Sequence, residues 1–209
     1  MSGKKLYAAL FVRSDSAYKK RVDCDAYDVE RDAKTFPGGL PCVCHPPCRT
    51  WGILAHMATN AAPGEKKLAL WAVRQVRQNG GVVEHPSTSR LFKNHLPGVG
   101  MFPDEFGGFT IQLDQFDFGH VAHKQTKLYI CGIGIKDLPD MPTKRHDYAD
   151  RSICGNVAGT KRCTQYQREY TPEKLIDFFE QILSMMAECR IQPRQSVRKR
   201  DRLAILTTA

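Results

Sequence analysis

The sequence predicts an α/β protein with an open, mainly parallel sheet that is flanked by helices and carries an antiparallel hairpin toward its C-terminus. Two observations lead to this prediction. Residues 40–84 are typical of a strand, a loop, a helix and a second strand, which implies neighbouring parallel strands joined by a right-handed crossover. Residues 109–133 contain two apolar runs separated by a turn, as in a hairpin.

Two strands precede that unit. Residues 5–12 (KLYAALFV) form an apolar run that indicates a buried strand, closed by polar residues 13–16. Residues 22–29 alternate between apolar and acidic residues, which suits a half-exposed strand or its carboxyl end. Residues 30–34 favour no more than a short helical turn, and the Pro-Gly-Gly sequence at 37–39 predicts a turn.

The central strand is predicted within the segment Leu40-Pro41-Cys42-Val43-Cys44-His45-Pro46-Pro47-Cys48 and carries Cys42 and Cys44. The two adjacent prolines cannot continue a strand ladder, so the chain must turn before Cys48. Catalytic groups gather beyond the carboxyl ends of strands in open α/β sheets. Cys48, followed by Arg49 and an aromatic residue, is therefore a candidate nucleophile. Cys42 and Cys44 share one face and are expected to be buried strand residues.

Residues 63–79 predict the clearest helix, with an apolar stripe along one side and Asn79-Gly80-Gly81 ending it as a left-handed cap would. Residues 82–84 predict a strand that His85-Pro86 stops. Because the carboxyl ends of parallel strands meet at one edge of the sheet, we expect Cys48 and Glu84 to face one pocket.

The remainder is less regular. Residues 87–108 are expected to be a loop, because Pro and Gly punctuate them. The hairpin strands are predicted at 109–115 and 127–133, and the polar residues between them should point toward the pocket; these are His120, His123, Lys124, Gln125 and Thr126. Residues 137–168 show no periodicity, which indicates an irregular excursion over the site or a partner contact.

The last predicted helix begins after Thr171 as a cap, with Pro172 in its first turn, and runs to about Cys189. Its apolar face consists of Leu175, Ile176, Phe179, Ile182 and Leu183. We therefore predict one α/β domain over residues 1–189. Residues 190–209 form a basic tail that we expect to be flexible and to contact phosphates.

The chain has 209 residues and a formal net charge of +9, from 31 basic and 22 acidic residues. A basic excess of this size favours a polyanionic partner, nucleic acid above all. No stretch resembles a signal peptide or a membrane span, so a soluble cytoplasmic protein with reduced cysteines is expected. The sequence leaves the oligomeric state open.

The order of these motifs resembles the middle of cytosine-5 DNA methyltransferases. The resemblance covers residues 40–132: a Pro-Pro-Cys loop after one strand, a Glu after the next, and the segment Gln125-Thr126-Lys127-Leu128-Tyr129-Ile130, similar to the family's Arg-containing strand. It implies a Rossmann-like, methyltransferase-like fold. The arrangement also resembles small phage-encoded proteins, for which the location would be the host cytoplasm.

The resemblance implies roles for individual residues. Cys48 matches the nucleophile that attacks carbon 6 of a flipped pyrimidine, and Glu84 matches the residue that binds the base nitrogens. S-adenosylmethionine would lie against the first strand ends, at Phe11, Ser14 and Asp28, where the family's glycine-rich loop is replaced by Phe11-Val12-Arg13-Ser14. The base or its phosphate would meet further polar residues, namely His45, Arg49, His85, Gln115, His120, Lys124 and Lys127.

This chemistry needs particular residue types. A pyrimidine becomes reactive at carbon 5 only after a thiolate adds at carbon 6, and that thiolate needs a neighbouring cation to lower its pKa. His45, Arg49 or His85 could supply the cation. Glu84 would hold the ring nitrogens of a base that has left its stack. The sequence thus predicts a transferase that modifies pyrimidines in DNA.

Two other functions fit the same sequence. One is a non-catalytic DNA-binding or anti-restriction protein that keeps the base-handling fold. The other is a zinc-binding interaction module built from Cys42, Cys44, His45 and Cys48, although these residues lack the usual paired Cys-x-x-Cys spacing. Structural roles are open as well: Glu84 as a helix cap, His120 and His123 as turn residues, and Trp51 and Trp71 as core residues.

Overall fold

Six strands form a mixed sheet in the computed structural model, which describes residues 4–153 and 157–191. The strand order is β2-β1-β3-β4-β6-β5. The first four strands run parallel, and β6 is antiparallel to both of its neighbours. The strands are β1 (Tyr7–Leu10), β2 (Cys24–Tyr27), β3 (Cys42–Cys44), β4 (Gly81–Pro86), β5 (Phe109–Asp114) and β6 (Gln125–Cys131). The predicted α/β class and hairpin are confirmed.

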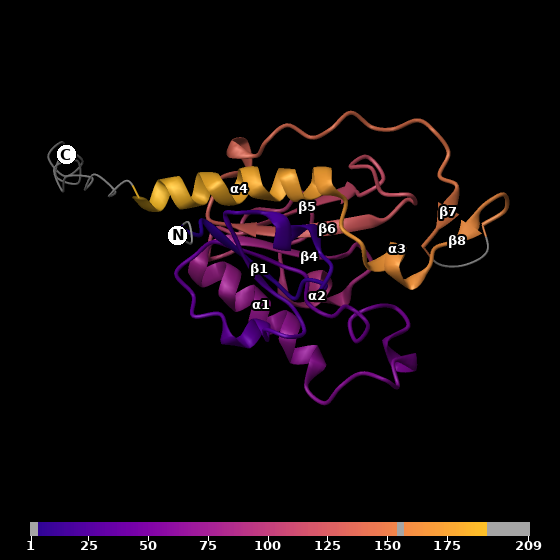
Figure 1. Cartoon of the computed structure of the whole chain (residues 1–209), viewed down its shortest axis with the longest axis horizontal. Coiled ribbons are helices and arrows are strands. Elements are labelled where there is room, and N and C mark those ends of the chain that lie inside the picture. Colours follow the sequence, from indigo (N-terminus) through magenta and orange to yellow (C-terminus); the bar gives the residue numbers. More distant parts are fainter. Residues whose placement is uncertain (1–3, 154–156, 192–209) are drawn as a thin grey trace, which may run out of the picture.

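Helices cover both faces of the sheet (Figure 1). On one face lie α1 (Glu65–Asn79) and the short α2 (Arg90–His95); on the other lies α4 (Glu173–Ile191). Successive strand residues point to opposite faces. Cys42 and Cys44 therefore both pack under α1, whereas Val43 packs under α4. The five apolar residues predicted for the last helix are all fully buried.

The β3–α1–β4 unit has the predicted parallel arrangement. The end of α1 differs from prediction, because Gly80 has φ 68° and ψ 158°, a positive-φ conformation that lies outside the left-handed helical region. The chain therefore passes directly into β4. Gly81 follows with φ 139°, and a Cβ atom there would lie 1.9 Å from the Cys42 carbonyl oxygen. Only glycine allows β3 and β4 to pair this closely.

Several boundaries were predicted wrongly; β6, for example, begins at Gln125 rather than at residue 127. His85-Pro86 does not stop β4, which pairs with β6 as far as Pro86 opposite Thr126. Pro86 is tolerated because β3 has already ended opposite Val83, so no strand on that side requires the missing N–H. The segment after it is not all loop, since Ser89 caps α2 by accepting a hydrogen bond from the Leu91 N–H at 3.2 Å.

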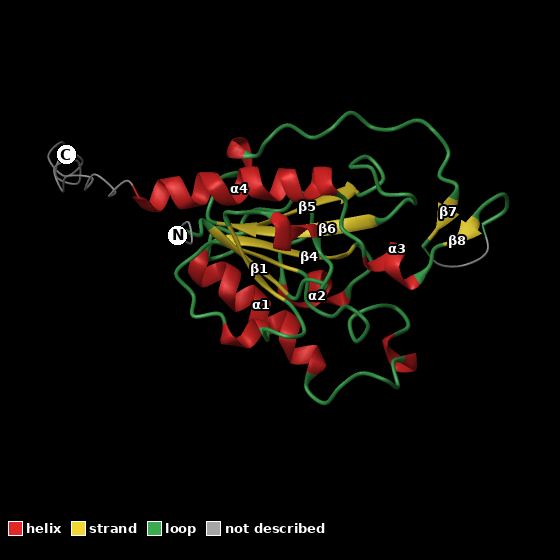
Figure 2. Ribbon diagram, viewed as in Figure 1, coloured by secondary structure: helices red, strands yellow, loops and turns green. Residues whose placement is uncertain are grey.

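The connection between the hairpin and α4 is mostly irregular, as predicted (Figure 2). It contains η4 (Ile135–Asp137), the short paired strands β7 (Arg151–Ser152) and β8 (Lys161–Arg162), and α3 (Gln165–Glu169). The other 3-10 turns are η1 (Ala17–Lys20), η2 (Ala33–Thr35) and η3 (Ala55–Met57). Most of the predicted basic tail lies outside the described residues. No helix within the described ranges is long and apolar enough to cross a bilayer.

Candidate functional site

The carboxyl ends of β3 and β4 bring His45 and Glu84 together. His45 Nδ1 lies 3.2 Å from Glu84 Oε2, and Gln115 Nε2 donates to Glu84 Oε1 at the same distance. Gln115, directly after β5, is 1% exposed and also donates to Thr126 Oγ1 at 3.0 Å. Residues just beyond the ends of β3 and β5 therefore fix the Glu84 carboxylate of β4.

Tyr18 completes this cluster from η1. Its hydroxyl lies 3.2 Å from His45 Nε2, and burial raises the Tyr18 pKa well above its usual value. The phenol therefore remains protonated, and the Tyr18 hydroxyl and the Glu84 carboxylate hold the two ring nitrogens of His45 from opposite sides. Tyr18 is a site residue that the sequence analysis missed, because it lies in a short polar segment with no motif.

The carboxyl group of Glu84 is ionised. Burial opposes its ionisation, but the hydrogen bond from His45 and the positive charge of Lys124 outweigh burial and lower the pKa to about 2. Glu84 is consequently an acceptor for hydrogen bonds at neutral pH. It is not a helix cap, since its contacts are with His45 and Gln115.

Cys48 lies on the exposed loop that follows Pro46 and Pro47. The chain around its thiol excludes enough water to raise its pKa, and the Glu84 carboxylate raises it further, whereas Lys124 and Arg49 act in the opposite direction. Cys48, Glu84 and Lys124 therefore share one electrostatic environment. The expected lowering of the thiol pKa is wrong for the free protein, because desolvation and the carboxylate dominate.

The cations expected beside Cys48 are engaged elsewhere. His85 is fully buried; its Nε2 lies 3.0 Å from the Pro46 carbonyl oxygen and its Nδ1 lies 2.8 Å from Ser89 Oγ. Burial lowers the His85 pKa, so the ring is neutral and ties the Pro-Pro-Cys loop to β4. Arg49 Nε forms an ion pair with Glu65 Oε1 at 3.1 Å.

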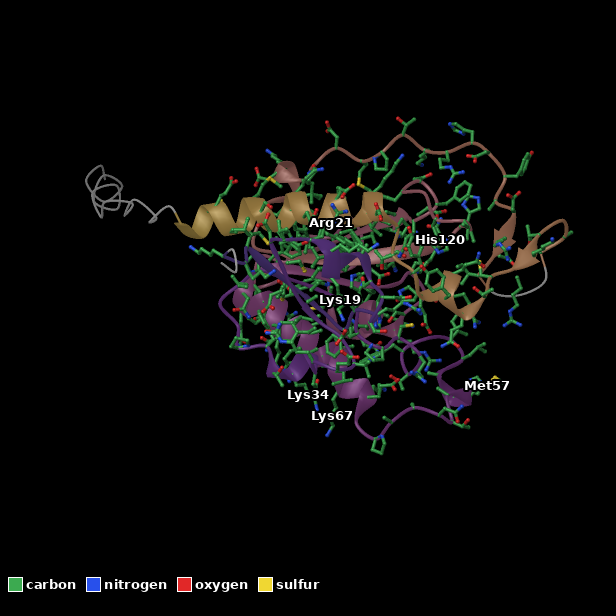
Figure 3. The ribbon with its side chains drawn as sticks, viewed as in Figure 1. Lys19, Arg21, Lys34, Met57, Lys67 and His120 are labelled. Atoms are coloured by element: carbon green, nitrogen blue, oxygen red, sulfur yellow. The ribbon has the colours of Figure 1, made fainter. Side chains whose placement is uncertain are left out.

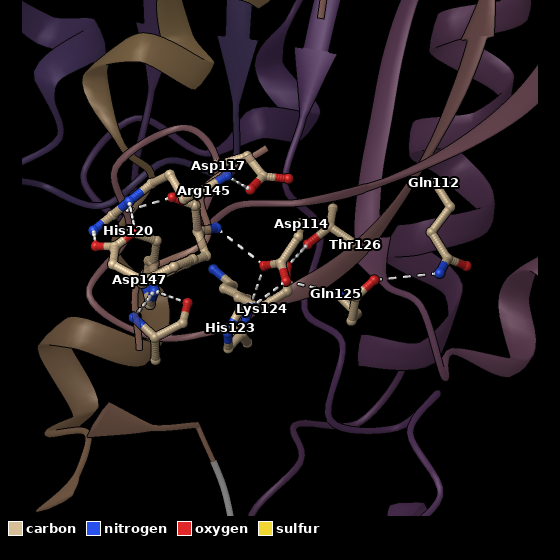
Figure 4. A network of polar contacts seen from close by, with 12 residues as sticks. Gln112, Asp114, Asp117, His120, His123, Lys124, Gln125, Thr126, Arg145 and Asp147 are labelled. Atoms are coloured by element: carbon tan, nitrogen blue, oxygen red, sulfur yellow. Dashed lines mark hydrogen bonds and ion pairs between the residues drawn. The ribbon is translucent and has the colours of Figure 1, made fainter. Parts of the chain in front are cut away.

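Lys124 is held by the turn between β5 and β6 (Figure 4). Asp114 Oδ1 accepts the Lys124 backbone N–H at 2.8 Å, and its Oδ2 lies 2.7 Å from His123 Nδ1. The Lys124 ammonium donates to the Tyr170 carbonyl oxygen at 3.4 Å. His123 is thus a turn residue. Lys124 is the cation that acts on both Glu84 and Cys48.

Two predicted base-binding residues lie away from this cluster. His120 is fully buried, accepts from the Ala122 N–H at 3.0 Å and donates from Nε2 to the Gln167 carbonyl oxygen at 2.7 Å, so it fastens α3 to the hairpin. Lys127 lies on the α1 face of β6, between Thr126 and Leu128, whereas Glu84 lies on the α4 face. Neither meets Glu84.

A cavity of about 680 Å³ opens beside the ends of β1 and β2. The strand order reverses between β1 and β3, and ligands of open α/β sheets bind at such a switch point. The lining residues include Phe11, Asp28, Pro47, Glu65, Trp71 and the basic residues Lys34 and Lys67, labelled in Figure 3. Ser14 is exposed and does not line the cavity.

Phe11, which lines this cavity, has an unusual backbone conformation. Its φ of 61° is the only positive value at a non-glycine among the described residues, and such strain concentrates at functional sites. The ring meets Trp71 edge to face, with centroids 5.8 Å apart. Asp28, by contrast, is occupied: it pairs with Lys19 at 2.5 Å and accepts the backbone N–H groups of Glu30 and Arg31.

The cysteine-rich segment does not converge on a metal. Cys42 and Cys44 lie in the core under α1, His45 lies on the opposite face and Cys48 lies on the exposed loop. Within the ranges that the structure describes, no three His, Cys, Asp or Glu side chains gather to hold a metal ion.

No family model matches this chain, and no curated protein matches it either.

Proposed function

We propose that the protein is a nucleic-acid-modifying transferase that acts on a pyrimidine base of DNA, in the manner of cytosine-5 methyltransferases. One observation carries this proposal: Cys48, on the loop after β3, and Glu84, in the C-terminal half of the neighbouring parallel strand β4, are close enough for the Glu84 carboxylate to raise the pKa of the Cys48 thiol. This edge adjoins the switch-point cavity through Pro47, the residue before Cys48. A nucleophile, a base-binding carboxylate and a cofactor-sized cavity are the parts that the chemistry requires.

Glu84 would recognise the base. An ionised carboxylate accepts the exocyclic amino group of cytosine, and thymine offers an acceptor at the same position. Each oxygen of Glu84 has a lone pair left after the bonds from His45 and Gln115. Gln115 Oε1 is also buried with no hydrogen-bond partner in the described residues, so a second acceptor lies next to Glu84. These groups favour cytosine.

Cys48 would add to carbon 6 of that base. The Sγ–C6 bond forms as the electron pair of the C5–C6 double bond moves to carbon 5, which then becomes nucleophilic. The thiol of the free protein resists ionisation, so the thiolate must form in the complex. Lys124, which already opposes the raised thiol pKa, would stabilise the thiolate once the base shields Glu84 from Cys48.

The switch-point cavity suits a methyl donor such as S-adenosylmethionine in size, since cofactor sites occupy roughly 300–1,000 Å³. Phe11 and Trp71 provide an aromatic wall for an adenine ring. Asp28 would not hold the ribose unless it exchanged its bond with Lys19. The donor would supply an electrophilic methyl group; the protein's own part is to bind the base, exclude water and hold the thiolate.

The test combines product analysis with binding. Purified protein is incubated with S-adenosylmethionine and DNA of mixed sequence, and the nucleosides are analysed by mass spectrometry. We expect a cytosine methylated at carbon 5, at least 100-fold less product with Cys48→Ala, and DNA affinity within threefold of the wild type. Cys24→Ala, at a cysteine buried elsewhere in the core, is the control and should keep its activity.

The raised Cys48 pKa also favours a second candidate, a non-catalytic protein that binds DNA with this fold. It predicts no modified nucleoside from the wild type and unchanged DNA affinity after Cys48→Ala. That result, with S-adenosylmethionine failing to bind at millimolar concentration, would overturn the enzymatic proposal.

A further inference from the structure

A second cavity, of about 280 Å³, lies on the α1 face of the sheet, where β4 leads into α2. Its lining comes from the segment after β4, from α2 and the loop after it, and from β5 and β6. Glu84 lies on the opposite face, so the two sites are separated by the sheet. Ser87 lines the cavity and is only three residues beyond Glu84.

The lining is positively charged. Arg90 and Lys93 project from α2 and Lys127 projects from β6, while no acidic residue lines the cavity. None of the three forms an ion pair with a described residue. Three unpaired cations around one small cavity repel one another, and an anion there would relieve the repulsion.

The neutral groups point to the kind of anion. The hydroxyl-bearing residues Ser87 and Thr88 line the cavity together with Thr110 of β5. Thr110 is 3% exposed, and its Oγ1 has no hydrogen-bond partner among the described residues. A buried hydroxyl without a partner is costly, so a ligand oxygen is the natural acceptor for it.

We propose that this cavity binds a phosphate group, with Arg90, Lys93 and Lys127 balancing its charge and Thr110 donating to one of its oxygens. Phosphate offers several strong acceptor oxygens, and guanidinium, ammonium and hydroxyl groups are its usual partners. The phosphate can come from a nucleic-acid backbone or from a free phosphate compound. The site does not depend on the function of Cys48.

Inorganic phosphate is the probe. Titration followed by amide chemical shifts should show saturable binding at low millimolar concentration, with the largest shifts in residues 87–93 and 110. Lys93→Met should weaken binding at least fivefold. Lys174→Met, which removes an exposed helical lysine of α4 that lines neither cavity, is the matched control and should not change the affinity.

Thr110→Val separates a binding role from a structural one. It keeps the side-chain shape and removes the hydroxyl, so phosphate affinity should fall at least threefold while thermal stability is unchanged or higher. No binding at 50 mM phosphate by folded wild-type protein would overturn the proposal. Equal affinity of the wild type, Lys93→Met and Thr110→Val would overturn it as well.

A second titration, in the presence of a short DNA duplex, identifies the source of the phosphate. A backbone phosphate predicts that the duplex displaces inorganic phosphate and that Lys93→Met weakens duplex binding. A free phosphate compound predicts that phosphate binds equally with and without the duplex. Cys48→Ala tests the base-modifying function alone. Phosphate binding at this cavity should be the same in Cys48→Ala as in the wild type.

Discussion

At the scale of single residues, the site depends on a buried chain of hydrogen bonds from Tyr18 through His45 and Glu84 to Gln115. The outer residues hold the central pair in place: Tyr18 contacts His45 on one side, and Gln115 donates to Glu84 on the other. A carboxylate fixed in this way offers the same acceptor geometry to every base that enters. This rigidity supports recognition, because little reorganisation is needed on binding.

Glu84→Gln tests this arrangement through stability. The amide presents an N–H₂ group to donors that faced a carboxylate, so we expect a loss of about 1–3 kcal/mol in the free energy of unfolding at pH 7. The pKa of Glu84 is about 2 in the folded protein, below the ordinary glutamate value of 4.5. The contribution of the ionised carboxylate to the free energy of unfolding is therefore complete above pH 4.5 and disappears as the pH falls toward 2.

Urea unfolding at pH 7 and at pH 3 measures this effect. The gap between wild type and Glu84→Gln should narrow at the lower pH, and the exposed control Glu105→Gln should match the wild type at both. A gap that is constant or wider at pH 3 would mean that Glu84 is not held as an anion.

The sequence predicted the parallel pairing of β3 and β4, which brings the Cys48 loop and Glu84 to the same side of the sheet ends. It did not predict the surroundings. His85 and His120 look like polar turn residues in sequence but are fully buried and bonded to main-chain carbonyl groups. Whether a histidine faces a ligand or the core depends on packing between distant segments, and local sequence does not carry that information.

At the scale of elements, the β3–α1–β4 unit positions both candidate residues, Cys48 and Glu84. Its register depends on Gly81, where a Cβ would collide with the backbone of Cys42. Strong periodicity made this unit predictable from sequence. The six residues of α2 show too little periodicity for detection between the surrounding Pro and Gly residues. Similarly, Pro86 suggested a strand end because proline lacks the N–H that a neighbouring strand would need. The sequence pattern does not show that β3 stops before it reaches Pro86.

Gly81→Ala should therefore destabilise the protein by more than 2 kcal/mol, or prevent folding, by forcing β3 and β4 apart. Gly64→Ala is the matched control, since Gly64 also has positive φ, 81°, but has open space where its Cβ would lie. It should cost only about 1 kcal/mol from backbone strain. Thermal unfolding of both variants compares them, and equal losses would contradict the proposed close packing at Gly81.

At the scale of the whole molecule, the sheet separates two activities that we assign to its faces. Glu84 lies on the α4 face, and the cavity that we propose for phosphate lies on the face of α1 and α2. Both lie where the chain leaves β4. A net charge of +9 favours approach of a polyanion.

The central claim is that Cys48 attacks a cytosine. The most direct measurement is intact-protein mass spectrometry after incubation with S-adenosylmethionine and mixed-sequence DNA in which cytosine carries fluorine at carbon 5. Release of Cys48 requires the hydrogen at carbon 5 to leave as a proton. Fluorine at that position cannot leave in this way, so the base stays bonded to Cys48. We expect a stable protein–DNA adduct on Cys48 and none with Cys48→Ala. Absence of an adduct in wild-type protein that binds both DNA and S-adenosylmethionine would contradict the account.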